Sequence, residues 1–262
     1  MPEATPLSEL LRGKRGLILG VANQNSIAWA CAHELHQAGM ELAFTYQGEI
    51  MRDRAVRTVA ALGEPLVYDV DVRSDEQIDA LFADLGERWG SLDFLLHSVA
   101  YAPREAMQNP FLETTRADFL AAHEISAYSL VGLTRAAAPM MPVGGSVVTM
   151  SYYGAAKAVP GYNVMGVAKA ALEAAVRYLA VDLGSRGIRI NAISAGAVNT
   201  LAARGVAHFR DLLRITAERA PLGRAIDTAE VGKAALFLAS DLSSGMTGET
   251  MYVDAGFNIT AG

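Results

Sequence analysis

Short apolar runs alternate with longer amphipathic stretches along this chain. Seven runs are rich in apolar and β-branched side chains, as buried strands are; they cover residues 16–19, 41–46, 66–70, 92–97, 146–150, 188–193 and 251–253. The longer stretches place apolar residues three and four positions apart, which predicts helices with one buried face; the clearest cover 27–38, 77–88, 119–138 and 170–182. We therefore predict one α/β domain over residues 1–262, with about seven strands in a doubly wound parallel sheet and helices on both faces.

The edge at which the strands of such a sheet end is the expected place for chemistry. In doubly wound sheets, ligands bind beyond the carboxyl ends of the strands. The functional residues should therefore come directly after Leu19, His97, Met150 and Ile193. The stretch 200–230 has no strand-like run but is amphipathic, and we expect it to form a helical flap.

Composition limits the classes of partner. The net charge of -6 and the pI near 5.4 argue against a nucleic-acid surface, which needs a basic face. No run approaches the roughly 18 apolar residues that span a bilayer, and residues 1–14 do not resemble a secretory signal. The single cysteine, Cys31, excludes an internal disulfide and fits a reducing compartment. We expect a cytoplasmic protein with no nucleic-acid or membrane partner.

The turn after the first strand has features of a phosphate-binding loop. Gly20 would let the backbone approach a phosphate, and Ser26 stands where a helix begins, beside the free amides of its first turn. The sequence is not Gly-x-Gly-x-x-Gly, so an ordinary strand-to-helix turn remains an alternative. The place of this turn, after the first strand of a doubly wound sheet, favours a dinucleotide.

The end of the second strand indicates which dinucleotide is used. An acid there usually selects a free ribose 2′-hydroxyl, and an arginine accommodates a 2′-phosphate. This chain has Gln47, then Glu49, and no basic residue before Arg52, so NADH is favoured over NADPH. After the third strand, Asp71 could accept a hydrogen bond from the adenine amino group, or it could be a solvated loop acid.

Two tyrosine–lysine pairs compete for the position over the cofactor. Tyr153 and Lys157 are followed by Ala-Val-Pro-Gly, which cannot continue a helix because proline lacks an amide donor. Tyr162 and Lys169 stand seven residues apart, just before the helix predicted over 170–182. Two helical turns take about 7.2 residues, so these side chains can converge on one target. We expect the second pair to carry the chemistry.

Several segments taken together resemble the bacterial enoyl-acyl-carrier-protein reductases, a divergent branch of the short-chain dehydrogenase/reductases. The resemblance covers about residues 13–257 and rests on Gly20-x5-Ser26-Ile27-Ala28, Phe44-Thr45-Tyr46-Gln47, the run 97–103, Tyr162-x6-Lys169 and the run 189–196. The 22-residue step from Lys169 to Asn191 also matches the wider family. The segment Ala197-Val198-Asn199 departs from the family's usual Pro-Ile/Val-Arg.

The resemblance implies a Rossmann-like fold with a helical substrate flap, and NADH-dependent reduction of the trans-2 double bond of enoyl thioesters on acyl carrier protein. It implies dinucleotide contacts at Gly20, Ser26, Ile27, Gln47, Asp71, Val72, Val99, Lys169, Val198, Asn199, Thr200, Leu201 and Ala202. Substrate contacts are expected at Ala102, Tyr152, Tyr162, Met165, Val206 and Phe209. The stretches 119–138 and 170–182 are rich in small and apolar residues that could pack against copies of themselves, so we expect a homotetramer.

The catalytic roles also follow from the resemblance. Hydride transfer to the β-carbon pushes charge onto the thioester carbonyl, and Tyr162 would donate a hydrogen bond to the resulting enolate. Lys169 would hold the nicotinamide ribose and favour the enolate through its charge. Tyr152 would orient the substrate, or it is an aromatic packing residue.

Two other functions use the same fold. A ketone or hydroxysteroid reductase would need the ordinary short-chain serine and Tyr-x3-Lys set, but Met165 stands four residues before Lys169. A nucleotide-sensing protein without turnover would usually have lost Tyr162 or Lys169. We expect His97 to be a hydrogen-bonded core residue, and no His, Cys or carboxylate cluster has metal-ligand spacing.

Overall fold

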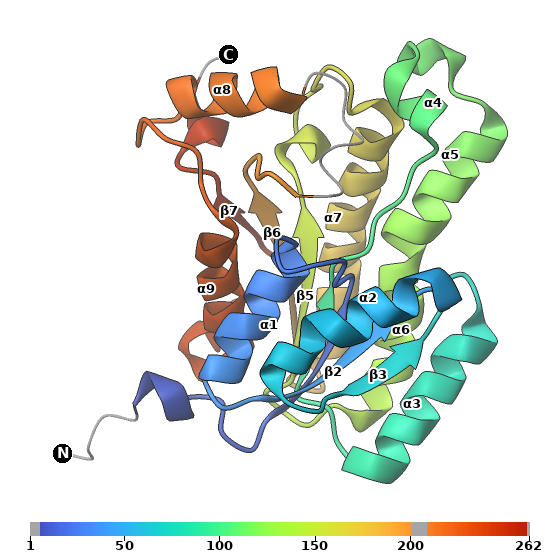
Figure 1. Ribbon diagram of the computed structural model, residues 1–262, viewed down its shortest axis with the longest axis vertical. Coiled ribbons are helices and arrows are strands. Elements are labelled where there is room, and N and C mark those ends of the chain that lie inside the picture. The colour runs from blue at the N-terminus through green and yellow to red at the C-terminus, as the bar shows by residue number, and fades with distance from the viewer. Residues whose placement is uncertain (1–5, 201–208, 261–262) are drawn as a thin grey trace.

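Within residues 6–200 and 209–260, which the computed structural model describes, seven parallel strands form one sheet in the order β3-β2-β1-β4-β5-β6-β7 (Figure 1). Side chains are described for 6–200 and 211–260. The strands are β1 Arg15–Leu19, β2 Glu41–Tyr46, β3 Leu66–Asp69, β4 Phe94–His97, β5 Ser146–Ser151, β6 Arg189–Ala195 and β7 Thr250–Val253. The seven strands predicted from the apolar runs are confirmed. The strand order reverses between β1 and β4, where a doubly wound sheet opens a crevice.

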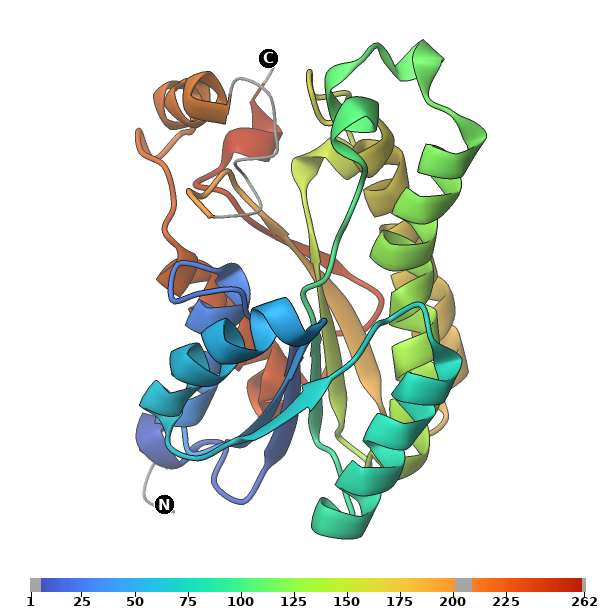
Figure 2. The same cartoon turned by 45° about the vertical axis from the view of Figure 1, so that its right-hand side comes forward.

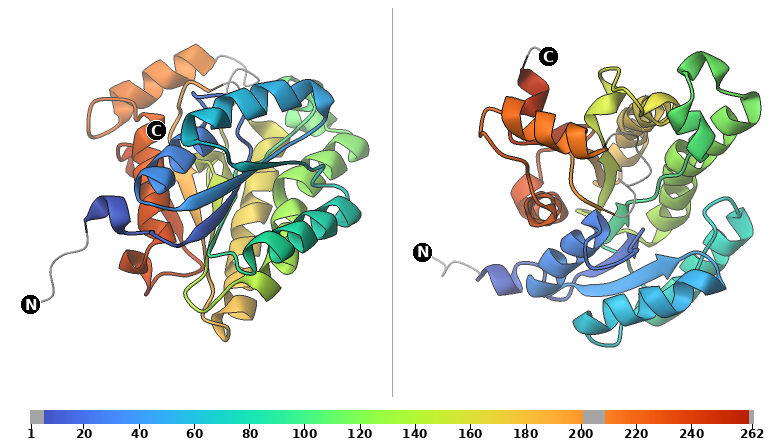
Figure 3. Two further views of the ribbon diagram at one scale, coloured as in Figure 1. Left: turned by 60° about the horizontal axis from the view of Figure 1, so that its bottom comes forward. Right: turned by 45° about the horizontal axis from the view of Figure 1, so that its top comes forward.

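Helices cover both faces of this sheet, so the predicted doubly wound α/β fold is confirmed (Figure 2). One face carries α1 Ile27–Gln37, α2 Glu49–Val59 and α9 Thr228–Ala239. The other carries α3 Asp75–Trp89, α5 Arg116–His123, α6 Ser129–Ala137 and α7 Asn163–Gly184. Beyond the carboxyl ends of the strands lie α4 Arg104–Gln108 and α8 Phe209–Arg219 (Figure 3). No helix in the described residues is long and apolar enough to cross a membrane.

Two apolar cores lie on the two faces of the sheet. Successive side chains of a strand point to opposite faces, so Leu17 and Leu19 pack with residues of α3, α6 and α7. Ile18, between them, packs with residues of α1 and α9. Because both faces are covered, the strands read as continuous apolar runs instead of alternating ones, as is typical of parallel sheets.

The helix predicted over 119–138 is interrupted. α5 and α6 are separated by a π-helical turn, Glu124–Tyr128, which sequence periodicity did not predict. Ser126 lies in this turn and clamps the segment after β4, because its hydroxyl accepts from the Tyr101 amide at 2.9 Å and donates to the Tyr101 carbonyl at 3.0 Å. Such turns often occur at functional sites.

The helix predicted over 170–182 begins earlier, at Asn163, and continues to Gly184. Tyr162 is the residue immediately before its first turn. The Asn163 side chain donates hydrogen bonds to the carbonyls of Met107 at 3.2 Å and Asn109 at 2.7 Å. These bonds tie the start of α7, which directly follows Tyr162, to the end of α4.

Candidate active site

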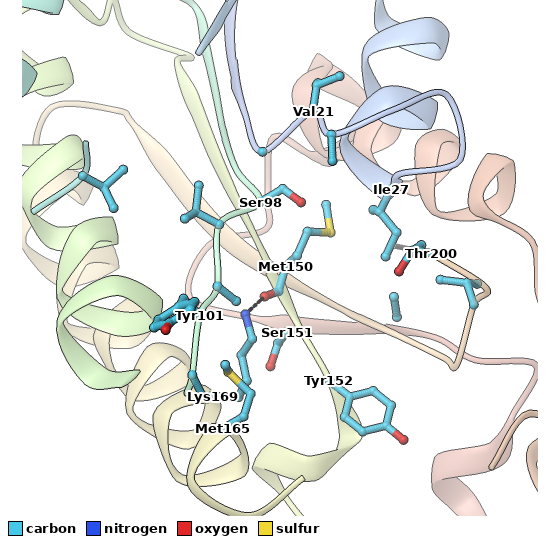
Figure 4. Close-up of a pocket in the computed structure, with 18 of the residues that line it drawn as sticks. Val21, Ile27, Ser98, Tyr101, Met150, Ser151, Tyr152, Met165, Lys169 and Thr200 are labelled. Atoms are coloured by element: carbon cyan, nitrogen blue, oxygen red, sulfur yellow. Dashed lines mark hydrogen bonds between the residues drawn. The ribbon is translucent and has the colours of Figure 1, made fainter. Parts of the chain in front are cut away.

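A cavity of about 720 Å³ opens at the carboxyl edge of the sheet, beside the start of α7 (Figure 4). Most of the residues expected at the site line it: Gly20, Ile27, Gln47, Val72, Val99, Ala102, Tyr152, Tyr162, Met165, Lys169, Val198 and Thr200. α8 falls within the stretch expected to form a flap, and its Leu212 also lines the cavity. The cavity therefore lies at the strand ends where the sequence predicted the chemistry.

Ser26 caps a helix and does not line the cavity. Its hydroxyl accepts a hydrogen bond from the Trp29 amide at 3.3 Å, which satisfies a free donor in the first turn of α1. The same hydroxyl donates to the Asn23 carbonyl at 2.7 Å. Ser26 therefore shapes the turn after β1, and it presents Ile27 to the cavity.

The other expected residues that do not line the cavity are absent from it for different reasons. Asp71 is paired with Arg73, whose hydrogen bonds hold the pKa of the carboxyl below its usual range. Asn199 is exposed beside the lining residues Val198 and Thr200. The residues outside the described part of the chain are Leu201, Ala202 and Val206, together with the side chain of Phe209.

Gly20 has two structural reasons to be glycine. Its φ is +94°, a conformation that other residues adopt only with strain. A Cβ atom on Gly20 would lie 2.0 Å from the backbone oxygen of Ser98. The backbone that follows β1 therefore touches the backbone that follows β4, at the point where the strand order reverses.

The Lys169 side chain is buried at the end of β5. Its ammonium donates a hydrogen bond to the Met150 carbonyl at 2.6 Å (Figure 4). Burial disfavours the charged form and lowers the pKa of Lys169 to about 8, while the Glu173 carboxylate, one turn along α7, opposes this shift. At pH 7 most molecules therefore carry the ammonium, in a place where few water molecules screen its charge.

Tyr152 and Tyr162 pack against each other beside the lysine. Their rings meet edge to face, with centroids 4.8 Å apart. Burial raises the pKa of the Tyr162 hydroxyl, and it raises the pKa of Tyr152 to about 12. Both phenols are thus neutral at pH 7 and can donate a hydrogen bond into the cavity.

The first tyrosine–lysine pair does not line the cavity. Lys157 is exposed in the turn before Pro160, and the Tyr153 ring packs against Phe257 with centroids 5.5 Å apart. Gly154, which lies between them in the sequence, packs against the Tyr162 ring. A Cβ atom on Gly154 would lie 2.4 Å from Cδ1 of Tyr162, so this glycine makes room for the ring of the second pair.

We expect Gly154→Ala to lower kcat by about tenfold. The added methyl group displaces the ring of Tyr162, which the sequence predicts to be catalytic, and a displacement of about 1 Å can cost up to a hundredfold. KM for NADH should change by less than about threefold. Steady-state kinetics test this. The control is Gly184→Ala, since Gly184 ends α7 with no atom within 4 Å of an added Cβ. Equal kcat values for both variants would contradict the role of Gly154.

His97 is a core residue, as expected from the sequence. Its ring nitrogens lie 2.8 Å from the hydroxyls of Thr149 and Ser129. Burial, followed by the charge of Lys169, lowers the pKa of His97 to about 3. The ring is therefore neutral at physiological pH, and it supports the end of β4 instead of exchanging protons.

Comparison with known proteins places the chain in a family. A family model described as enoyl-(acyl carrier protein) reductase matches residues 20–258. The chain belongs to this family. The enoyl-acyl-carrier-protein reductase (NADH) 1 of Rhizobium meliloti is 49% identical, over 96% of this chain and 92% of its relative.

Solved reductases of this family have the same fold. The enoyl-acyl carrier protein reductase of Bacillus cereus, in complex with NADP+ and indole naphthyridinone, is 47% identical with a TM-score of 0.95, covering 97% of this chain and 99% of the other. The reductase of Anaplasma phagocytophilum, in complex with NAD, is 44% identical with a TM-score of 0.92, covering 97% and 95%. The fold and the family inferred from sequence are thus confirmed.

The structure adds lining residues of this family member for which the sequence predicted no contact: Tyr46, Met51, Tyr101 and Met107. Ser98 directly follows β4 and Ser151 ends β5, and both line the cavity, where the rule about strand ends placed functional residues. Met51 and Met107 come from α2 and α4, and only tertiary packing brings them to the cavity. The sequence did not indicate that Glu173 supports the site. Its carboxylate, on α7, accepts a hydrogen bond at 2.5 Å from Ser151, at the end of β5, and a contact between two elements leaves no local pattern in the sequence.

Proposed function

We propose that this chain reduces the trans-2 double bond of enoyl thioesters on acyl carrier protein, with NADH as hydride donor, in fatty acid elongation. The observation that carries the proposal is that Tyr162 and Lys169 line one cavity at the strand ends, whereas Tyr153 and Lys157 do not. The family of the chain supports the same reaction.

The cavity fits a dinucleotide. Its volume is about 720 Å³, and its lining extends from Tyr46 and Gln47, at the end of β2, to Tyr162 and Lys169. Gly20 and Ile27 bring the turn after β1 to the same space. When bound, NADH supplies the hydride. Lys169 would hold the hydroxyls of the nicotinamide ribose, since its ammonium has three donors and Met150 takes one of them.

Tyr162 stabilises the charge that develops on the substrate. As hydride reaches the β-carbon, negative charge moves to the thioester oxygen, and the neutral Tyr162 phenol donates a hydrogen bond to it. A preorganised donor of this kind is commonly worth about 3 to 4 kcal/mol in the transition state. The positive charge of Lys169 stabilises the negative charge on the same thioester oxygen. Tyr152 supports the Tyr162 ring by their edge-to-face contact.

The reaction can be tested against its two alternatives in one assay. NADH oxidation is followed with crotonyl thioester and with a panel of ketones and oxidised hydroxysteroids. We expect turnover with the thioester alone. Turnover with the ketones would instead indicate ordinary short-chain chemistry, for which Met165 occupies the position of the usual tyrosine. NADH binding without turnover of either class would indicate a nucleotide-sensing protein.

We expect kcat/KM for NADH to fall as pH rises through about 8, because the Lys169 ammonium that holds the ribose is lost above its pKa. Above the pKa, kcat/KM should fall by at most about tenfold per pH unit, the value reached if NADH binds only to the form with the Lys169 ammonium. Of the titratable groups that face Lys169, Glu173 and His97, the ring of His97 is neutral in this range because its pKa is lowered to about 3. The stability of the free protein should change in the opposite direction: between about pH 8 and 10.5 the unfolded chain holds the extra proton at this site, so the free energy of unfolding rises with pH.

Lys169→Arg is the matched control for this pH dependence. A guanidinium remains charged above pH 12, so the variant should show a flat profile even where its kcat/KM is lower overall. A decline through pH 8 that persists in Lys169→Arg would assign the titration to another group.

We also propose a cytoplasmic homotetramer. On α7, Tyr178 and Val181 are 78% and 79% exposed, and on α5, Leu120 is 60% exposed. Exposed apolar side chains on neighbouring helices are stabilised when they are buried against other copies of the chain.

Light scattering should show four times the chain mass of 27.8 kDa at micromolar concentration. Val181→Glu should lower the mass, whereas Ile50→Glu should not, because Ile50 is 96% exposed on α2, which covers the other face of the sheet. A monomer for the unaltered protein would end this proposal.

A further inference from the structure

An acidic side chain from β3 binds the backbone amide that follows β2. Asp69, the last residue of β3, accepts a hydrogen bond from the Gly48 amide at 2.7 Å. Gly48 has a φ of +77° and immediately precedes α2. The strands here lie side by side, with Asp69 in register with Tyr46 (Figure 1). Tyr46, Gln47 and Val70 all line the cavity, so Asp69 and Gly48 stand at its edge.

Two arginines of this region, Arg52 and Arg73, have carboxylate partners of their own. Arg52, on the first turn of α2, forms an ion pair with Glu49 at 3.3 Å. Arg73, after β3, forms hydrogen bonds with both oxygens of Asp71. Neither guanidinium is therefore an unpaired cation that could neutralise an added phosphate.

Asp69, in contrast, can accept another donor. Its Oδ1 is bonded to Gly48, and among the described residues none donates to its Oδ2. Its charge reaches the cavity lining, because the pKa of the Tyr46 hydroxyl is raised first by burial and then by the Asp69 carboxylate.

In doubly wound dinucleotide-binding folds, the adenosine ribose lies near the end of the second strand, and an acid there accepts from the 2′-hydroxyl. Here β2 is followed by Gln47, which is not an acid. We propose that Asp69, from the neighbouring strand, takes this role and selects NADH over NADPH. The inference rests on the proposed use of NADH and names the residue that enforces it.

Two physical effects exclude the 2′-phosphate. A phosphate at the start of a helix is bound through free backbone amides, and the Gly48 amide is already bonded to Asp69. The Asp69 carboxylate also repels a dianionic group placed beside it. The free 2′-hydroxyl of NADH meets neither obstacle, since it can donate to Oδ2.

The test is Asp69→Asn, which keeps an oxygen that can accept from Gly48 but removes the charge. We expect the dissociation constant of NADPH to fall by at least about tenfold, and that of NADH to rise by no more than about threefold. Both are measured by equilibrium titration of the fluorescence of the reduced nicotinamide, so turnover is not needed. Thermal unfolding should be nearly unchanged, because the hydrogen bond to Gly48 is retained.

Asp53→Asn is the matched control, since it removes the same charge from an exposed position on α2. The ratio of the two dissociation constants should stay as in the unaltered protein. The proposal is overturned if Asp69→Asn weakens both dinucleotides alike, which a purely structural role predicts, or if Asp53→Asn shifts the ratio equally. If the unaltered protein binds neither dinucleotide, the proposed function itself fails, and that outcome is distinct from an unchanged ratio.

Discussion

Replacing Lys169 by alanine should raise the dissociation constant of NADH by at least about a hundredfold. The ammonium is buried at the end of β5, where it donates to the Met150 carbonyl and faces the cavity. Truncating one partner of a buried, charged hydrogen bond costs about 2 to 5 kcal/mol. NADH would lose this binding free energy, because the lysine would hold its ribose. Equilibrium titration of NADH measures the effect directly.

Tyr162→Phe should have the complementary effect. Its kcat should fall by about a hundredfold to a thousandfold, as expected when one preorganised donor to a developing oxyanion is removed. The dissociation constant of NADH should change by less than about threefold, because in the proposed mechanism the tyrosine contacts the substrate and not the dinucleotide. Equal losses of NADH affinity in Lys169→Ala and Tyr162→Phe would refute this division of roles.

The chain provides its own controls for this pair. Lys157→Ala and Tyr153→Phe remove the same groups from the pair that does not line the cavity. Each variant should keep at least about half of the activity, as exposed or peripheral substitutions usually do. Loss of turnover in either control would mean that the wrong pair has been assigned.

Gly20→Ala should weaken NADH binding strongly and destabilise the fold. The added Cβ would lie 2.0 Å from the Ser98 oxygen and 2.7 Å from the Ser98 carbonyl carbon, and backbone atoms cannot move aside as a flexible side chain can. The segments that follow β1 and β4 must therefore separate, which opens the site where the dinucleotide would bind. We expect kcat/KM for NADH to fall at least about a hundredfold, since small displacements of binding groups have effects of this size.

Gly63→Ala separates the contact from the backbone strain. Gly63 has a φ of +98°, close to that of Gly20, but a Cβ there would meet no atom within 4 Å. A non-glycine residue in such a conformation costs about 1 to 3 kcal/mol, so Gly63→Ala should lower the melting temperature and leave kcat/KM nearly unchanged. Equal kinetic losses in the two variants would show that strain, and not the Ser98 contact, explains the importance of Gly20.

The elements of this fold could be predicted because their signals are local. Strand runs and the 3.6-residue period are read within about 15 residues, so all seven strands and the buried face of α7 were found. The π-helical turn at Glu124–Tyr128 was not, because apolar periodicity is nearly the same in α- and π-helical turns of this length. Its place depends on Ser126 holding the backbone of Tyr101, a contact between elements.

The sequence by itself determined the doubly wound sheet, the edge at which the cavity opens and which tyrosine–lysine pair stands at the start of α7, because Pro160 and the helical period act on their neighbours in the chain. The tertiary structure alone decided how the site is supported. Gly20 meets Ser98, Glu173 accepts from Ser151, and Asp69 holds the Gly48 amide. Each of these contacts joins residues that are about 20 or more positions apart, so no local pattern records them. They arise only when the strands end side by side and α7 packs beside β5, because that arrangement brings distant backbone and side chains into contact.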